Sequence, residues 1–212
     1  MTHAELPRTE RQQVTVDVCK AVAGDQGRLS ATLARAFDDY PLINWMVAQD
    51  KRRSRRVFDA MDLTLRKFTM PHDEVYTTPA IQGGALWSPP GKWKMGILQQ
   101  VLLLPEVAKI ATWRRIPAVM GGIGAIEKKH PHQPHFYLFV LGVDPEMQGK
   151  GVGTQLMAPV LERCDREGLP AYLESSKEKN LPLYERNGFK VTERLQVPNG
   201  GPPIWLMWRD PQ

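Results

Sequence analysis

Hydrophobic residues recur along the chain with two different spacings, and the two spacings predict different elements. In Leu29, Leu33 and Phe37 the spacing is four residues, which is typical of one face of a helix. In Val14–Val18 apolar and polar residues alternate, which is typical of a half-buried strand. The first spacing predicts helices over 25–37, 42–46, 51–70, 95–110, 117–129, 154–167 and 181–187. The second spacing, together with short apolar runs, predicts strands over 14–18, 74–78, 83–88, 136–143, 171–174, 191–197 and 204–208.

The order of these elements indicates the fold class. After residue 136 the predicted order is strand, helix, strand, helix, strand, strand, and the last two strands form a hairpin around Asn199-Gly200-Gly201. Alternating strands and helices predict an α/β protein with a mixed sheet. With 212 residues, the chain is expected to form a single domain over 1–212, in which 1–11 fray.

Composition narrows the class of protein. The chain has 42% hydrophobic and 24% charged residues and a net charge of +5, which is typical of a globular protein. The charge is too small to predict a nucleic-acid partner, although four arginines lie close together at 52–56. No apolar run is long enough for a membrane span, and 1–11 lack the apolar segment of a signal peptide. With two cysteines, Cys19 and Cys164, and no ligand spacing around them, we expect a reduced, cytoplasmic protein without a metal site, as a monomer or homodimer.

A turn with glycines at alternate positions joins the strand 136–143 to the next helix. Gly149, Gly151 and Gly153 stand where backbone N–H groups and the positive end of a helix dipole meet. This combination predicts a pocket for a phosphate or diphosphate. The spacing does not fit the nucleoside-triphosphate loop, because Gly142 lies seven residues before Gly149 and Lys150 is followed by glycine. Nor does it fit the dinucleotide fingerprint, whose third glycine is absent.

Two motifs instead resemble a family of acyl-CoA enzymes. The first is Gln148-x-x-Gly151-x-Gly153 after a strand that ends in Val-x-Pro. The second is Asn-x-x-x-Tyr-Glu-Arg-x-Gly-Phe over 180–189. Both resemble the GCN5-related N-acetyltransferases (GNAT family), and the resemblance extends over 136–209. It implies a mostly antiparallel sheet that splays between two parallel central strands, helices on both faces, and acetyl-CoA as co-substrate.

The resemblance also implies which residues contact acetyl-CoA. A bulge at Gly142 is expected to turn the strand edge towards the pantetheine arm, and the N–H of Val143 is expected to stabilise the oxyanion. The alternative is that Gly142 only relieves steric crowding around the strand. The expected cofactor-binding residues are Leu141, Gly142, Val143, Gln148, Gly149, Lys150, Gly151, Val152, Gly153, Thr154, Asn180 and Tyr184.

Two side chains are candidates for proton transfer. The resemblance places the hydroxyl of Tyr184 near the CoA sulfur, where it would protonate the leaving thiolate. Glu174, at the end of the next strand, is the candidate base that removes a proton from the amine. Alternatively, Tyr184 is a core tyrosine with a satisfied hydroxyl, and Glu174 is a structural carboxylate bonded to the backbone. Cys164 is expected to be a packed thiol, so transfer should proceed without an acyl-enzyme.

The acceptor is less well defined by the sequence. The resemblance suggests a small amine such as an aminonucleoside or antibiotic, with Asp38, Asp39 and Tyr40 as candidate contacts; a polar helix end without a function is the alternative for these three residues. An aromatic acceptor pocket would be lined by one of Trp45, Trp87 and Trp93. The histidines of 130–135 are expected in a flexible polar loop rather than a metal site. A peptide N-acetyltransferase and a non-catalytic acyl-CoA-binding regulator remain the alternatives.

Overall fold

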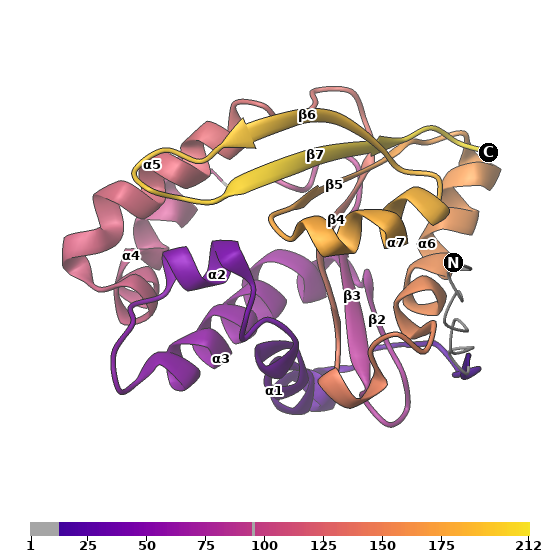
Figure 1. The fold of residues 1–212 in the computed structure, drawn as a ribbon, viewed down its shortest axis with the longest axis horizontal. Helices are drawn as coiled ribbons and strands as arrows, with labels where there is room; N and C mark the ends of the chain where they lie inside the picture. Colours follow the sequence, from indigo (N-terminus) through magenta and orange to yellow (C-terminus); the bar gives the residue numbers. More distant parts are fainter. Residues whose placement is uncertain (1–12, 95) are drawn as a thin grey trace, which may run out of the picture.

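A seven-stranded sheet forms the centre of the molecule in the computed structural model, which describes residues 13–94 and 96–212 (Figure 1). The expectation for 1–11 lies outside the described residues. The strand order is β1-β2-β3-β4-β5-β7-β6, and only β4 and β5 run parallel. The strands are β1 Cys19–Lys20, β2 Val75–Thr77, β3 Gly83–Ser88, β4 Phe136–Val143, β5 Ala171–Ser175, β6 Lys190–Gln196 and β7 Pro203–Arg209. The predicted mixed sheet with two parallel central strands is confirmed.

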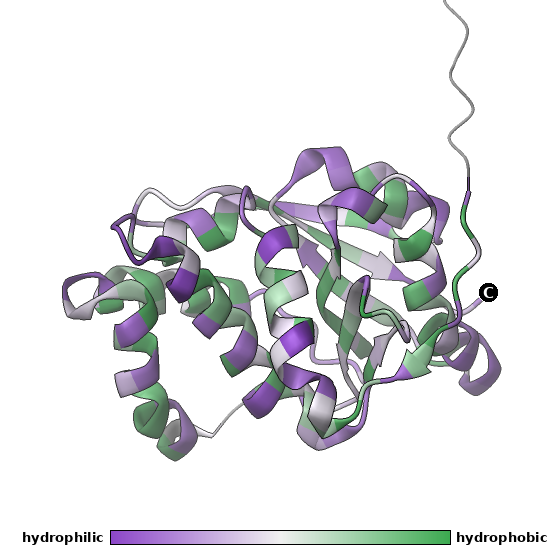
Figure 2. Ribbon diagram, turned by 90° about the horizontal axis from the view of Figure 1, so that it is seen from below, coloured by the Kyte–Doolittle hydropathy of each residue, from purple (hydrophilic) through white to green (hydrophobic). Residues whose placement is uncertain are grey.

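Helices cover both faces of this sheet. The helices are α1 Gln26–Ala36, α2 Pro41–Met46, α3 Arg53–Thr64, α4 Ile97–Ala111, α5 Ile116–Glu127, α6 Val152–Glu167 and α7 Leu181–Arg186. One buried cluster joins the inner stripe of α6 to β3, β4 and β5, whereas another joins α1 and α3 to the opposite face. The helices are banded in hydrophobic and hydrophilic colours, as expected for elements with one buried face (Figure 2). No described helix combines the length and apolar character needed to cross a membrane.

The strand predicted over Val14–Val18 is wrong, because this segment bonds to the α6 region. The N–H of Val14 donates to the carbonyl of Lys150 (3.0 Å), and the N–H of Val16 donates to Oε1 of Gln155 (2.9 Å). The ladder with β2 begins only at Cys19. The alternation was still informative, since Val16 and Val18 pack against the core beside α6.

The helix predicted over Lys51–Met70 ends early. Regular α3 stops at Thr64 and continues as a π turn over Leu65–Thr69 and a 3₁₀ turn over Met70–His72. The extra residue in the π turn keeps both Leu65 and Thr69 buried against the sheet.

Acidic partners neutralise most of the basic start of α3. Arg53 pairs with Asp38, Arg55 with Asp59 (2.8 Å) and Arg56 with Asp50 (2.7 Å). These arginines therefore connect the helix to its neighbours, and their clustering in sequence does not produce a uniformly basic surface.

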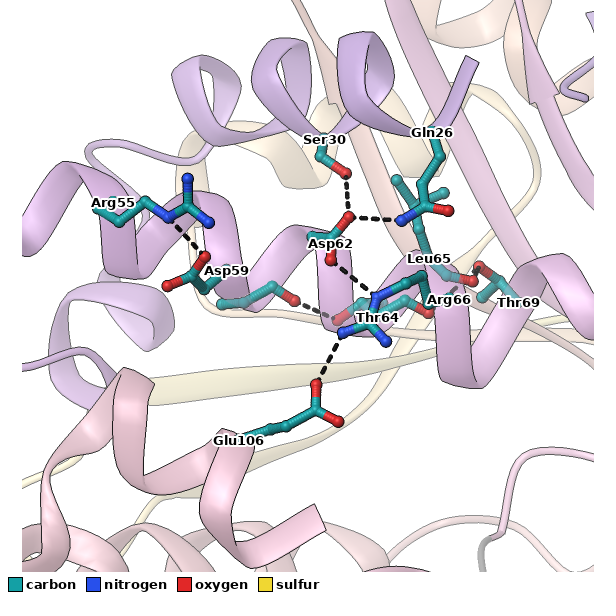
Figure 3. Close-up of polar contacts among 11 residues, drawn as sticks. Gln26, Ser30, Arg55, Asp59, Asp62, Thr64, Leu65, Arg66, Thr69 and Glu106 are labelled. Atoms are coloured by element: carbon teal, nitrogen blue, oxygen red, sulfur yellow. Dashed lines mark hydrogen bonds and ion pairs between the residues drawn. The ribbon is translucent and has the colours of Figure 1, made fainter. Parts of the chain in front are cut away.

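Asp62 of α3 joins three helices through hydrogen bonds. It accepts from Gln26 (2.7 Å) and Ser30 (3.4 Å) of α1 and from Arg66 (2.8 Å), which also bonds Glu106 of α4 at 2.7 Å (Figure 3). Burial opposes the charge of Asp62, but the hydrogen bonds from Gln26 and Arg66 prevail, so the pKa of this carboxyl lies below its ordinary value.

A bulge in β4 lies at Phe139, not at Gly142 as predicted. Leu86 of β3 pairs with Val140 and Trp87 pairs with Leu138, so Phe139 is the extra residue. Before it, Phe136 and Leu138 point towards α6; after it, Leu141 and Val143 do so. The bulge thus shifts the alternation by one residue.

Gly142 is required by close packing. A Cβ at this position would lie 2.7 Å from Cδ2 of Leu33 and 3.2 Å from Cβ of Ala36. Helix α1 therefore crosses β4 directly at this glycine. Of the two explanations for Gly142, a bulge or relief of crowding, the structure supports relief of crowding.

Candidate active site

The parallel strands β4 and β5 separate in the middle of the sheet. They are paired from Phe136–Ala171 to Leu138–Leu173, and the register is not continued beyond Leu138 although β4 extends to Val143. The second half of β4 therefore has a strand edge that faces the gap. An open edge of this kind can pair with an extended ligand.

The ladder between β3 and β4 determines which backbone groups face that gap. The N–H of Asp144 donates to the carbonyl of Gln82 (2.8 Å). Because an antiparallel ladder alternates, the N–H groups of Leu141 and Val143 then point away from β3, towards β5. The side chain of Gln148 reaches the carbonyl of Val143 from this same side (3.0 Å). The geometry suits the predicted role of Val143, which remains a prediction.

The glycine loop ends at a helix start without a side-chain cap. Gly149 has φ 77° and Gly151 has φ 85°, a left-handed conformation that glycine adopts without strain. Helix α6 begins at Val152, two residues before the expected Thr154, and its N-cap is Gly151 itself. The first N–H groups of α6 therefore have no intrahelical acceptors and are available to an anion.

Side chains contribute little to this loop. Gln148 is engaged with Val143, and the amine of Lys150 lies 3.9 Å from the sulfur of Met147. A Cβ on Gly153 would make only ordinary contacts with the protein, the nearest at 3.5 Å to Leu183. The protein's own packing thus does not require glycine there, whereas close approach of a ligand to the backbone would.

Tyr184 lies in α7, on the α6 side of the sheet. Its side chain is buried (6% exposed) against Phe189, and its hydroxyl makes no hydrogen bond to any described residue. Burial, and to a lesser degree the nearby Tyr40, raises the pKa of Tyr184. The hydroxyl therefore stays protonated and can act as a donor. Asn180, the residue before α7, is half-buried.

Glu174 lies on the opposite face of β5. Its neighbour Leu173 packs towards α6, so the side chain of Glu174 points to the other side, as Tyr172 does. The hydroxyl of Tyr137 in β4 donates to Oε2 of Glu174 at 2.5 Å, and Nδ1 of His130 lies 3.4 Å from Oε1. Glu174 is thus held by partners from β4 and from the segment after α5. Sequence reasoning missed both Tyr137 and His130, although alternation along β4 and β5 puts Tyr137 and Glu174 on one face.

The histidine segment is not the flexible polar loop that was expected. His130 and His135 are 4% and 2% exposed, and only His132 of the three is exposed to solvent. Prolines made the segment resemble a surface loop, but the aromatic rings of Tyr172 and Trp208 cover it. In the described part of the chain, no group of three or more His, Cys, Asp or Glu side chains is placed to hold a metal ion.

Of the three candidate tryptophans, Trp93 is the one that packs on His130, a partner of Glu174. Its ring stacks on His130 with centroids 3.7 Å apart. Trp87 is fully buried beneath α6, and Trp45 donates to the carbonyl of Asn199 (3.2 Å).

The polar segment between α1 and α2 binds the residues that follow β5. The N–H of Ser176 donates to the hydroxyl of Tyr40 (2.9 Å), and Lys177 pairs with Asp39. The hydrogen bond from Lys177 lowers the pKa of Asp39 despite partial burial. These residues therefore position the strand that carries Glu174.

The comparisons with known proteins agree with this geometry. Residues 73–189, more than half of the chain, match the family model for the acetyltransferase (GNAT) family. The chain therefore belongs to the GNAT family and is an acyl-CoA-dependent N-acetyltransferase, a class that uses acetyl-CoA.

One related sequence and two solved structures are similar to most of this chain. An uncharacterized N-acetyltransferase of Schizosaccharomyces pombe is 26% identical over 201 residues, covering 90% of this chain and 81% of its own. The crystal structure of a "histone acetyltransferase HPA2 and related acetyltransferase" from Corynebacterium glutamicum aligns with a TM-score of 0.73 at 22% identity, over 94% of this chain and 98% of that one. Arylalkylamine N-acetyltransferase 2 of Aedes aegypti aligns with a TM-score of 0.62 at 14% identity, over 94% and 100%. The two structures show the likeness of fold.

Proposed function

We propose that this protein transfers the acetyl group of acetyl-CoA directly to the primary amine of a small molecule. The observation that carries the proposal is the environment of Glu174. The carboxylate is buried against Tyr137 and His130, on the face of the sheet opposite Tyr184, and Trp93 stacks on the ring of His130. Such aromatic, enclosed surroundings suit a small acceptor better than an extended peptide, which needs an open groove.

The positions of Glu174 and Tyr184 give each a separate task. The thioester would lie along the edge of β4, where the N–H of Val143 donates to the carbonyl oxygen as it becomes an oxyanion. Glu174 takes a proton from the acceptor amine so that the nitrogen lone pair can attack the carbonyl carbon. The C–N bond forms and the C–S bond then breaks. Tyr184 gives its proton to the departing thiolate and regains one from the positively charged nitrogen, which thereby becomes the neutral amide, so that one proton in total leaves to solvent.

Cofactor binding would be carried mainly by the main chain of 148–154, with the diphosphate against the start of α6. The remaining contacts would come from the edge of β4 at Leu141–Val143 and from Asn180 and Tyr184. No acyl-enzyme is needed in this scheme. Burial raises the pKa of Cys164, which packs inside the core, to about 12, so its thiol is not a nucleophile near neutral pH.

The acceptor class is supported by sequence likeness as well. Ala36–Pro41, the Gln-Gly-Lys-Gly loop, the segment 173–186 and the closing Gly-Pro-Pro-Ile-Trp-Leu-Met-x-Arg resemble puromycin N-acetyltransferase. One structural neighbour is named for arylalkylamine acceptors. An aminonucleoside or an aromatic amine is therefore the acceptor we would test first.

An amine panel tests the proposal. Thiol release from acetyl-CoA is measured with small aromatic amines, aminonucleosides, polyamines and peptides with free N-termini. We expect release with a small amine, and a fall of about 10²- to 10⁴-fold in Glu174→Gln with acetyl-CoA binding retained. Turnover of peptides alone would establish the peptide N-acetyltransferase instead. Binding of acetyl-CoA without turnover of any amine would indicate a non-catalytic regulator.

A further inference from the structure

A chain of buried polar contacts leads from a backbone carbonyl to Glu174. Nδ1 of His135 lies 2.6 Å from the carbonyl oxygen of Gln133, and Nε2 of His135 lies 3.0 Å from Nε2 of His130. Nδ1 of His130 lies 3.4 Å from Oε1 of Glu174. Each histidine therefore uses both ring nitrogens.

The direction of the hydrogen bonds follows from the first contact. A carbonyl oxygen only accepts, so Nδ1 of His135 carries a proton. Burial lowers the pKa of His135, although its bond to Gln133 opposes this, so the ring is neutral and its Nε2 accepts. Nε2 of His130 must then carry the proton between the two rings.

This assignment leaves one open proton position. With its proton on Nε2, the His130 ring turns the lone pair of Nδ1 towards Oε1 of Glu174, which is an acceptor as well. Between these two atoms there is room for one proton and no donor to fill it. The separation of 3.4 Å is longer than an ordinary hydrogen bond, as expected for two acceptors facing each other.

The other groups around the pair cannot supply that proton. The hydroxyl of Tyr137 already donates to the second oxygen of Glu174, and burial raises its pKa well above the ordinary value. Burial, followed by the charge of Glu174 and a hydrogen bond to it, raises the pKa of the Tyr172 hydroxyl too, so this group keeps its proton. Trp93, stacked on His130, has no titrating group and covers the ring.

We infer that His130 and Glu174 together receive the proton of the acceptor amine, and that His135 fixes the His130 tautomer that makes this possible. The inference rests on the proposed function; it assigns His130 as a second part of the base and His135 as a positioning residue. The N–H bond of the ammonium breaks, its electron pair stays on nitrogen, and the proton comes to lie between Oε1 and Nδ1. It leaves to solvent after the products have dissociated.

Variants of two histidines in the same segment give a kinetic test. In His130→Asn an amide replaces the imidazole beside Glu174 and cannot take up a proton. We expect kcat/KM for the amine at neutral pH to fall about ten- to hundredfold, the KM for acetyl-CoA to stay unchanged, and the acid limb of the pH profile to move by about one pH unit. His132→Asn is the matched control, because His132 is exposed and outside the cluster; its profile should equal that of the wild type. Equal profiles for both variants would overturn the inference.

A spectroscopic measurement does not depend on finding the acceptor or on a stable variant. In the wild-type protein labelled with ¹⁵N-histidine, NMR should show His135 protonated on Nδ1 and His130 on Nε2 at high pH. On acidification, Nδ1 of His130 should become protonated in the same step in which the ¹³C signal of the Glu174 carboxyl shifts. Independent titration of the two groups, or His135 protonated on Nε2, would refute the inference even if amine acetylation is established. Failure of the amine panel with these signals present would instead remove only the proposed acceptor class.

Discussion

Substituting the two glycines at the ends of α6 separates backbone strain from cofactor binding. Gly151, at the N-terminus of the helix, has φ 85°, and Gly168, just after its C-terminus, has φ 67°. A Cβ at Gly151 would have its nearest neighbours at 3.8 and 3.9 Å, and a Cβ at Gly168 would meet nothing within 4 Å. Neither methyl group clashes, so Gly151→Ala and Gly168→Ala both carry mainly the cost of alanine in the left-handed region, about 1–2 kcal/mol.

The two variants should therefore lose similar stability and differ in binding. A loss of about 1 kcal/mol lowers the Tm of a chain of this size by roughly 2–4 °C. In Gly151→Ala the loop can relieve this strain only by turning its N–H groups away from the anion, and one hydrogen bond to a charged phosphate is worth about 1.5–3 kcal/mol. At 1.4 kcal/mol per factor of ten, the affinity for acetyl-CoA should fall about ten- to hundredfold.

Calorimetric titration with acetyl-CoA, next to thermal unfolding without ligand, measures both quantities. Gly168→Ala should bind acetyl-CoA as the wild type does. If Gly151→Ala bound it equally well while showing the expected loss in Tm, the diphosphate would not lie on this loop, and the reasoning from the uncapped start of α6 would fail.

Three further predictions follow from the structure. In Tyr184→Phe the hydroxyl is lost without breaking a hydrogen bond to the described protein, so the Tm should stay within about 1 °C while kcat falls at least tenfold; an unchanged kcat would exclude Tyr184 as the acid. In Asp62→Asn, stability should fall by about 1–3 kcal/mol at pH 7; because the folded pKa of Asp62 lies below its unfolded value, this difference should shrink progressively as the pH falls below about 4, and a constant difference in urea melts across pH 3–7 would contradict it. With a thiol-specific alkylating reagent at pH 8, the folded protein should be modified at the exposed Cys19 and not at Cys164, whose pKa is about 12; mass spectrometry identifies the site, and modification of Cys164 in the folded protein would show that its burial is incomplete.

Local patterns in the sequence predicted most of the helices and strands of 136–209. The apolar run of β4 was predicted with its observed bounds, Phe136–Val143, because a strand buried on both faces needs a continuous hydrophobic run. Gly168 was predicted as the stop of α6 because a left-handed residue ends a helix, and it has φ 67°. These signals are local and depend on a few neighbouring residues.

Features that depend on distant contacts were not predicted. The segment 14–18 has the pattern of a strand, but Gln155, far along the chain, takes its hydrogen bonds. His130 and His135 lie among prolines, and only packing against Tyr172 shows that they are buried. Gly142 illustrates the same point, because the reason for it is helix α1 crossing the strand.

The bulge at Phe139 divides β4 into two stretches, and it allows even-numbered residues before it and odd-numbered residues after it to point towards α6. If Phe139 instead took a regular place in the ladder, everything after it would turn to the other face of the sheet: Leu141 and Val143 would swap sides with Gly142, and two bulky side chains would meet the helix that now crosses a bare backbone. Core packing in the first stretch would survive, whereas the exposed edge of the second would offer the wrong amides. Inserting or deleting one residue in the stretch after the bulge is thus far less tolerable than most substitutions there.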